Sequence, residues 1–263
     1  EVALAIVLLA GAGLVLRSFA NRLAVDPGFR SEGVLTAVTI APNDRYRDVA
    51  AREALQRRMF EAVGTIAGVQ EVGAAAVTPL TGNNWTVPFE RADQPVPDGE
   101  RPPDVGWQSA TGGYFRAMRI PLHAGRLFSD ADGPGSRAVV IISQALEARF
   151  FPGESAVGRM VKTGPDVAEI VGVVGNIRRA ALTDAPHADM YYPLERTPGT
   201  ATTLFIRTAG DPTAIVPELR SALRGIEPGL TLRGIVPMAE IARESLHVTR
   251  LAMWLLGVFA AIA

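Results

Sequence analysis

The three histidines have the broadest catalytic and metal-binding chemistry in this sequence, and they are far apart. His123, His187 and His247 fall in separate predicted elements, and the chain has no cysteine. Disulfides, thiolate zinc sites and cysteine nucleophiles are therefore excluded. His187 and Asp189 are close enough to share a metal, but a solvated loop between Pro186 and Met190 explains them better. We predict no metal site.

An acidic turn is the nearest approach to a calcium-binding loop. Asp130, Asp132 and Gly133 match parts of such a loop, but the twelfth position from Asp130 is Ile141, where the loop needs a glutamate. The following residues, PGS, are typical of turns. We therefore predict a structural turn here.

No segment has the spacing of a nucleotide-binding or hydrolase motif. The only lysine, Lys162, lies in RMVKTGP, outside any G-x-x-x-x-G-K-[ST] pattern. Gly11 and Gly13 begin a G-x-G, but Leu16 stands where the third glycine belongs, and no strand precedes it. G-x-S-x-G is also absent. The sequence thus predicts no catalytic residue, no cofactor and no enzyme activity.

Two glycines and two arginines occur in the segment VGVVGNIRR. Gly172 and Gly175 favour a tight strand crossing or a turn over phosphate binding, because no helix start follows them. Arg178 and Arg179 could meet a partner's acid or a lipid phosphate, but a solvated hairpin end is favoured. Five aromatic residues are predicted to be core anchors: Tyr114, Phe115, Phe128, Phe150 and Phe151.

Composition and charge indicate a folded protein that does not bind nucleic acid. Hydrophobic residues make up 48% of the 263 positions, enough for a substantial core. The 26 basic and 27 acidic residues leave a formal net charge of -1, with no basic patch in the sequence.

Both ends of the chain have the composition of membrane helices. VALAIVLLAGAGLVL, residues 2–16, carries no charge, and at 1.5 Å per residue it reaches about 22 Å of a bilayer core of roughly 30 Å. LAMWLLGVFAAIA, residues 251–263, is equally apolar. A secretory signal peptide is the alternative for the first stretch, but the basic region and initiating methionine are missing. We predict truncated transmembrane helices with stalks over 1–22 and 241–263.

A strand, helix, strand unit occurs twice between these ends. In the first unit, Leu55, Met59, Val63 and Ile66 recur at helical spacing, with Asp48 as the predicted N-cap and Gly68 just past the helix. The units comprise strands at 33–42 and 71–80 around the first helix, and strands at 202–210 and 230–238 around a helix within 212–229. Two such units predict an α+β fold with a ferredoxin-like split βαβ layer.

The middle of the chain has a different character. Residues 83–104 indicate loops with short strands around Trp85 and Phe89. Between 120 and 193, short apolar runs alternate with turns, and Ser143 is a predicted helix cap. We predict a porter-like lobe from 23–115 and 196–240, with a small β-rich lobe, 116–195, inserted in it.

A series of short sequence segments in fixed order resembles a known family. They include SATGGYFRAMRIPLHAGRLFSDAD, VVIISQALEARFFPGESAVGRMV, EIVGVVGNIR and MYYPL, between the juxtamembrane LVLRSFANRLAVDPGFRSEGVLT and the closing MWLLGVFAAIA. Together they resemble the MacB-like periplasmic core domain of FtsX-like ABC transporter permeases, and more narrowly the acidobacterial duplicated orphan permease group.

The resemblance implies a non-catalytic permease subunit in the bacterial inner membrane, with its soluble domain in the periplasm. It implies a cytoplasmic ABC ATPase, a second permease half or homodimer partner, membrane lipid, and a periplasmic protein as partners. The alternative is a membrane-anchored binding or sensor module that does not transport. Further hydrophobic spans after Ala263 would favour the permease, and a cytoplasmic output domain the sensor.

Topology adds one expectation. The chain is predicted to leave the membrane through residues 17–21 and to return through 245–250, so the two stalks should be neighbours. No proline or glycine occurs from Ala239 to Leu256, so one continuous helix is expected to run from the domain into the bilayer.

Overall fold

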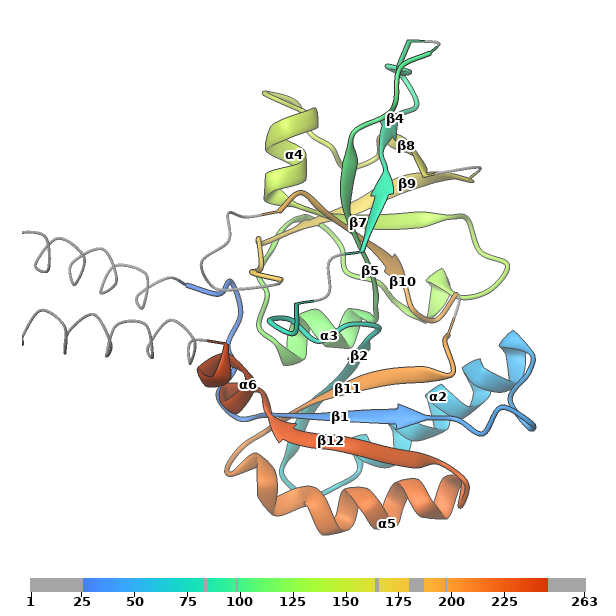
Figure 1. Cartoon of the computed structure of the whole chain (residues 1–263), viewed down its shortest axis with the longest axis vertical. Helices are drawn as coiled ribbons and strands as arrows, with labels where there is room; N and C mark the ends of the chain where they lie inside the picture. Colours follow the sequence, from blue (N-terminus) through green and yellow to red (C-terminus); the bar gives the residue numbers. More distant parts are fainter. Residues whose placement is uncertain are drawn as a thin grey trace, which may run out of the picture.

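A computed structural model of the chain describes residues 26–82, 85–97, 99–163, 166–179, 187–196 and 198–245. The two predicted membrane spans, 2–16 and 251–263, lie outside these residues. Within them, no helix combines the length and the apolar character that a membrane crossing requires. Figure 1 shows mixed helices and strands, with the start of the described chain and α6 on the same side.

The first predicted unit forms β1 (Val34–Ile40), α2 (Val49–Gly64) and β2 (Val69–Ala75). The predicted cap is confirmed, since the Asp48 carboxylate accepts a hydrogen bond of 2.6 Å from the Ala51 amide. Leu55, Met59 and Val63 are buried, as their spacing predicts. The helix ends four residues before Gly68, and β2 ends at Ala75 rather than at residue 80.

The second unit forms β11 (Ala201–Thr208), the short 3₁₀ helix η2 (Pro212–Ile215), α5 (Val216–Ile226) and β12 (Thr231–Pro237). The four strands lie in the order β12-β1-β11-β2, and each neighbouring pair is antiparallel. β11 thus lies between the two strands that α2 connects. This is the order that a split βαβ arrangement predicts.

The same sheet continues through strands from the middle of the chain, in the order β5-β10-β7-β9-β8-β4, with β3 beside β5 and β6 beside β9. A single residue pair, Ala75 with Ala110, joins β2 to β5. The strands are β3 (Thr86–Pro88), β4 (Glu90–Arg91), β5 (Asp104–Ala110), β6 (Leu122–Gly125), β7 (Val139–Ser143), β8 (Met160–Thr163), β9 (Asp166–Val174) and β10 (Asp189–Pro193). The remaining helices are α3 (Gly112–Ala117), η1 (Asp130–Asp132), α4 (Gln144–Phe150) and α6 (Met238–Glu244).

Strand alternation distributes apolar side chains to the two faces of the four-stranded part. On β11, Leu204 and Ile206 pack in the core under α2 and α5, whereas Phe205 points to the opposite face, toward Tyr114 of α3. Tyr114, Phe115 and Phe128 belong to this second core, and Phe151 to a third one beside α4. Phe150 is partly buried against the third core, so the aromatic prediction is confirmed.

The second core brings distant parts of the chain together. It contains Phe29, side chains from β1, α3, β7, β9, β10 and β11, and Met238 from α6. α3 can lie close against β2 because Gly73 and Gly113 are glycines. A Cβ at Gly73 would clash with the backbone of Gly113, and one at Gly113 with the Val72 carbonyl. α3 is therefore fixed to the sheet by direct contact between backbones.

Candidate functional site

The acidic segment at 130–133 is a capped structural turn, as predicted. The Asp132 carboxylate accepts hydrogen bonds from the Arg126 guanidinium at 2.6 and 2.8 Å, and from the Ser129 amide at 2.9 Å. Burial alone would raise the pKa of Asp132, but these donors outweigh burial and lower it. Both of its oxygens thus accept hydrogen bonds from protein groups.

The histidines do not form a metal site in the part of the chain that is described. There, no group of three or more histidine, cysteine, aspartate or glutamate side chains could hold a metal. His123 lines a cavity, and His247 lies outside the described residues. The carbonyl of His187 accepts a hydrogen bond from Ser143, whose hydroxyl also caps α4 as predicted.

Asp189 and Arg179 were predicted to be solvated, and both predictions are wrong. Asp189 and Arg179 form a buried ion pair, with 3.0 Å between Arg179 Nη1 and Asp189 Oδ1, and their side chains are only 2% and 5% exposed, respectively. Arg179 also donates to the carbonyls of Trp85 and Trp107. Burial raises the pKa of Asp189 to about 6, against the opposing effect of Arg179. No sequence pattern revealed this pair, because its burial depends on β5, whose Gly106 lies against both side chains.

Gly172, in β9, and Gly175, directly after it, lie at points of close approach, as predicted. A Cβ at Gly172 would clash with the Arg126 carbonyl, and one at Gly175 would lie 2.8 Å from the Pro121 ring. Gly172 is paired in β9 between β6 and β7. Neither glycine lies at the start of a helix.

The segment that enters the domain, residues 26–32, is held by contacts on several sides. The Arg30 amide donates to the Met118 carbonyl at 2.8 Å, and the Arg178 amide donates to the Pro27 carbonyl at 2.9 Å. Gly28 has a φ of +82°, and a Cβ there would clash with the Asn176 carbonyl. This glycine therefore serves both a left-handed turn and a close packing contact.

Arg207 fixes the same segment from the centre of the sheet. Its guanidinium is buried and donates to the carbonyls of Arg30 and Glu32 at 2.8 Å and of Ala117 at 2.6 Å. Burial, with the nearby Arg119 charge, lowers the pKa of Arg207. Arg207 was not among the residues predicted from the sequence, although an arginine on the core-facing side of a buried strand is a detectable signal.

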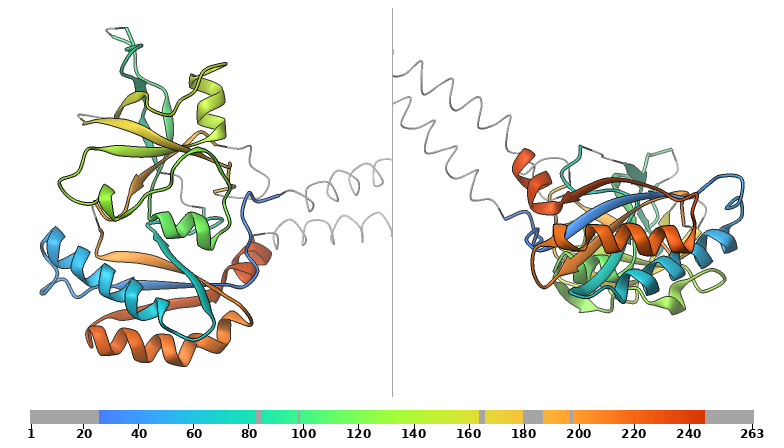
Figure 2. Two further views of the ribbon diagram at one scale, coloured as in Figure 1. Left: turned by 180° about the vertical axis from the view of Figure 1, so that it is seen from behind. Right: turned by 90° about the horizontal axis from the view of Figure 1, so that it is seen from below.

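α6 packs beside this entry segment. Met238 is fully buried, and Ile241 and Ala242 pack against the core that contains Phe29. Figures 1 and 2 show the start of the described chain and α6 on the same side of the molecule in every view. The structure therefore attaches both ends of the domain to one core.

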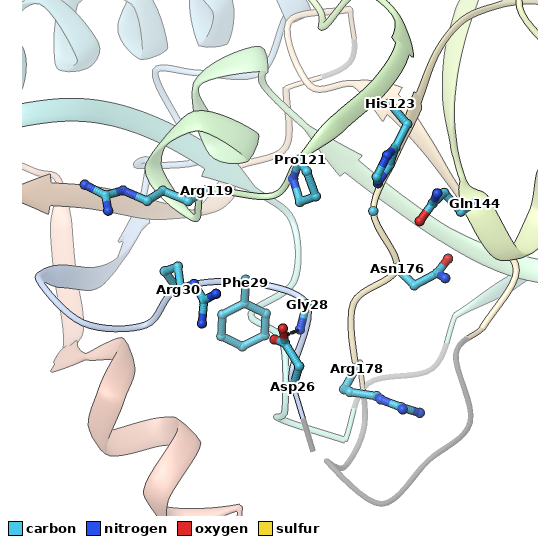
Figure 3. A pocket seen from close by; sticks show the side chains of 11 residues that line it. Asp26, Gly28, Phe29, Arg30, Arg119, Pro121, His123, Gln144, Asn176 and Arg178 are labelled. Atoms are coloured by element: carbon cyan, nitrogen blue, oxygen red, sulfur yellow. Dashed lines mark hydrogen bonds between the residues drawn. The ribbon is translucent and has the colours of Figure 1, made fainter. Parts of the chain in front are cut away.

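An open cavity of about 500 Å³ lies next to the entry segment (Figure 3). Asp26, Arg30, Arg119 and Arg178 are among its lining residues, and His123 and Asn176 contribute to its wall. The Asn176 carboxamide oxygen accepts a hydrogen bond of 2.7 Å from the Ala145 amide, which fixes this part of the wall. Asp26 accepts a bond of 2.9 Å from the Gly28 amide. The lining thus combines three arginines with one carboxylate.

The family profile for the MacB-like periplasmic core domain matches residues 2–225. The periplasmic region of MacB from Actinobacillus actinomycetemcomitans resembles the structure with a TM-score of 0.51 and 13% identity, over 86% of this chain and 98% of that one. The extracellular domain of the ABC-type transporter YknZ from Gram-positive bacteria follows with a TM-score of 0.46 and 17% identity, over 76% of this chain and 100% of that one. No curated protein matches the sequence. The first of these likenesses shows a common fold.

Proposed function

The chain belongs to the family of MacB-like periplasmic core domains, and on this premise we propose that it couples ATP-driven movement of membrane helices to transport or mechanical work across the bacterial inner membrane. It is a periplasmic domain of an ABC permease-type protein, and domains of this family work with an ATPase subunit. The domain's own part in that process is mechanical and non-catalytic.

The observation that carries the proposal is the attachment of the entry segment and of α6 to one core. Arg207 bonds the entry segment to the central strand β11 and to the end of α3, and Met238 secures α6 in the same core. A displacement of either end therefore acts on packed elements, which transmit strain because close-packed interiors have low compressibility. A loosely tethered domain would absorb the same displacement in its linkers.

The proposed role requires several partners. We propose a cytoplasmic ABC ATPase, a second permease half or homodimer partner, surrounding membrane lipid and a periplasmic partner protein, with no nucleic acid. The predicted spans 2–16 and 251–263 would carry movement between the ATPase and the domain. They would anchor the protein in the inner membrane with residues 23–240 in the periplasm.

We also propose that the domain has two lobes. The four-stranded part and the strands β5, β7, β9 and β10 are joined within the sheet by one residue pair, and each has a core of its own beside the shared one. The proposed second lobe contains residues 116–195. It would also include β4 and β5, which pair with strands from that range, and β3, which pairs with β5. Native-state hydrogen exchange should then give two groups of amides with different opening free energies. A single common value would contradict the division.

Neighbouring stalks can be tested by crosslinking, because the chain has no cysteine of its own. With cysteines in place of Ser18 and His247, a short bifunctional reagent should join the two stalks in membranes. Cysteines in place of Ser18 and Ser221 form the control pair, since α5 carries Ser221 on an exposed surface. Equal yields for the two pairs would contradict the arrangement.

Transmission through α6 is tested by inserting four glycines after Glu244 in the complex with the ATPase. We expect ATP to alter hydrogen exchange in α6 and the entry segment of the wild type, and the insertion to remove that difference. The same insertion after Glu100, in an exposed loop, should leave it intact. Retention of the ATP-dependent difference in the Glu244 variant, with the domain folded, would refute coupling through a rigid stalk.

A further inference from the structure

We propose that the arginines around the cavity in Figure 3, which we call the basic rim (Arg30, Arg119 and Arg178), bind the phosphates of anionic phospholipid headgroups at the membrane surface. The proposal rests on the proposed function, because that function turns this face of the domain toward the bilayer. It adds a binding site and the chemical class of its ligand.

The charge of the basic rim is not neutralised by the protein. Among the described residues, no acidic side chain forms an ion pair with any of the three arginines, and the one carboxylate in the lining, Asp26, accepts from the Gly28 amide. Arg207, buried beside Arg119, adds to the positive potential and has its pKa lowered, first by burial and then by that neighbour. These charges are therefore available to an anion from outside the described part of the protein.

Arg119 occupies a backbone conformation that an arginine adopts at a cost. Its φ is +52°, in the left-handed region where glycine or asparagine is easier to accommodate. The backbone here is held by a hydrogen bond of 3.0 Å from the Arg119 amide to the Arg116 carbonyl. The Ile120 amide also donates to the Phe115 carbonyl at 2.9 Å, so the two bonds form the C-terminal cap of α3, and this cap leaves the charged side chain at the cavity edge.

The directions of the side chains favour a surface over a single small anion. In Figure 3 the guanidinium groups of Arg119 and Arg178 extend to opposite sides of the cavity, with Arg30 between them. A site for one free phosphate would need donors that converge on a point. Donors that diverge around an opening can instead meet several headgroups of a bilayer at once.

The position of the cavity close to the predicted membrane stretch is the second reason to propose a lipid ligand. Asp26, in the cavity lining, follows the predicted membrane stretch 2–16 by only ten residues, so the cavity is tied by a short segment to the proposed bilayer surface. An anionic surface attracts arginine side chains within a Debye length of about 8 Å. α6, which leads toward the other predicted span, lies on the same side (Figure 2).

The experiment uses the full chain in lipid nanodiscs, with an environment-sensitive dye on a cysteine in place of Gln144, an exposed residue of the cavity wall. Phosphatidylglycerol is titrated into phosphatidylcholine discs. We expect a saturable spectral change that depends on phosphatidylglycerol and is lost at high salt. Each arginine near an anionic surface contributes about fivefold to binding, so Arg119→Gln with Arg178→Gln should raise the lipid fraction required roughly 25-fold, beyond what a bilayer can contain.

The matched control removes the same charge elsewhere. Arg220→Gln with Arg224→Gln alters two exposed arginines of α5, which ends where β12 begins, at the opposite end of β12 from α6. This variant should respond to phosphatidylglycerol as the wild type does. Equal loss in both double variants would show a general charge effect and would overturn the proposal.

Two further arms separate the possible failures. Inorganic phosphate is added to neutral discs, and a saturable response to it with none to phosphatidylglycerol would identify a free-anion site and overturn the lipid assignment. A nitroxide on the phosphatidylcholine headgroup should quench the dye at Gln144 more than one at Ser221. Absence of that difference would contradict the membrane-facing orientation and so the proposed function. A normal difference with no response to phosphatidylglycerol would overturn only the lipid site.

Discussion

The buried pair of Arg179 and Asp189 allows a quantitative test of how the structure holds β10 against β5. In Asp189→Asn the guanidinium stays buried and charged, because arginine does not deprotonate in proteins, but the amide replaces the neutral carboxyl that burial favours, so the free energy of unfolding should change by less than about 1 kcal/mol near pH 5. In Arg179→Met the carboxyl loses the positive charge that opposes the effect of burial, so the loss at neutral pH should be larger, about 2–3 kcal/mol. The double variant should cost about 2–3 kcal/mol less than the sum.

The pH dependence follows from the raised pKa of Asp189, which is about 6 in the folded protein and ordinarily 3.8. A raised folded pKa gives a contribution to stability that is complete below pH 3.8 and lost as the pH rises through 6. Arg179 lowers the pKa of Asp189, so this pKa is higher in the Arg179→Met variant. The variant therefore continues to lose stability at higher pH than the wild type does. Arg179→Met should therefore destabilise least near pH 5 and most near pH 8, whereas the deficit of Asp189→Asn should not follow this course.

The assay is urea unfolding of the full chain in mild detergent, followed by circular dichroism and by tryptophan fluorescence. Trp85 and Trp107 report directly, because their carbonyls accept hydrogen bonds from Arg179. Additive losses in the double variant, together with parallel pH profiles, would refute the reasoning. Such a result would mean that the two charges are solvated or stabilised by other groups.

Three other predictions concern single residues. Gly73→Ala should lower the free energy of unfolding by about 3 kcal/mol, because its Cβ would clash with the backbone of Gly113, and thermal unfolding would measure this. Gly225→Ala, in α5 with no neighbouring atom within 4 Å, should instead stabilise by about 0.5–1 kcal/mol, and a lower melting temperature would contradict the helix assignment. Burial raises the pKa of Glu195 from 4.5 to about 7, so its contribution to stability is complete below pH 4.5 and is lost as the pH rises through 7. Glu195→Gln should gain up to about 3 kcal/mol on the wild type between pH 5 and pH 8, and parallel urea midpoints would refute this.

Local patterns predicted the secondary structure where one face of an element is buried. The helical spacing of Leu55, Met59 and Val63 and the caps at Asp48 and Ser143 were enough, because the period of a helix and its cap chemistry are properties of neighbouring residues. The boundaries were less accurate. β2 ends at Ala75 although its neighbour β11 continues to Ala201, beyond the pair of Thr203 with Ala75, and the sequence after Ala75 is equally apolar.

The charged residues show the limit of local reasoning. Asp189 and Arg179 were predicted to be solvated because polar residues near turns usually are, and only the parallel pairing of β5 with β10 makes them a buried pair. Arg207 was missed for the same reason, since its three carbonyl acceptors belong to Arg30, Glu32 and Ala117, far away in the sequence. A charge can be buried only where distant groups supply its partners.

The sequence by itself determined the repeated strand, helix, strand pattern, the apolar ends, the absence of nucleotide and thiolate motifs, and a family resemblance that the comparison with known families confirms. These features depend on residue type and short-range spacing, which are complete in the sequence. The tertiary structure alone decided that Arg30, Arg119 and Arg178 surround one cavity beside the entry segment. They come from three separate segments, and the contacts that bring them together are set by long-range strand pairing and by burial of a shared core, which no local pattern encodes.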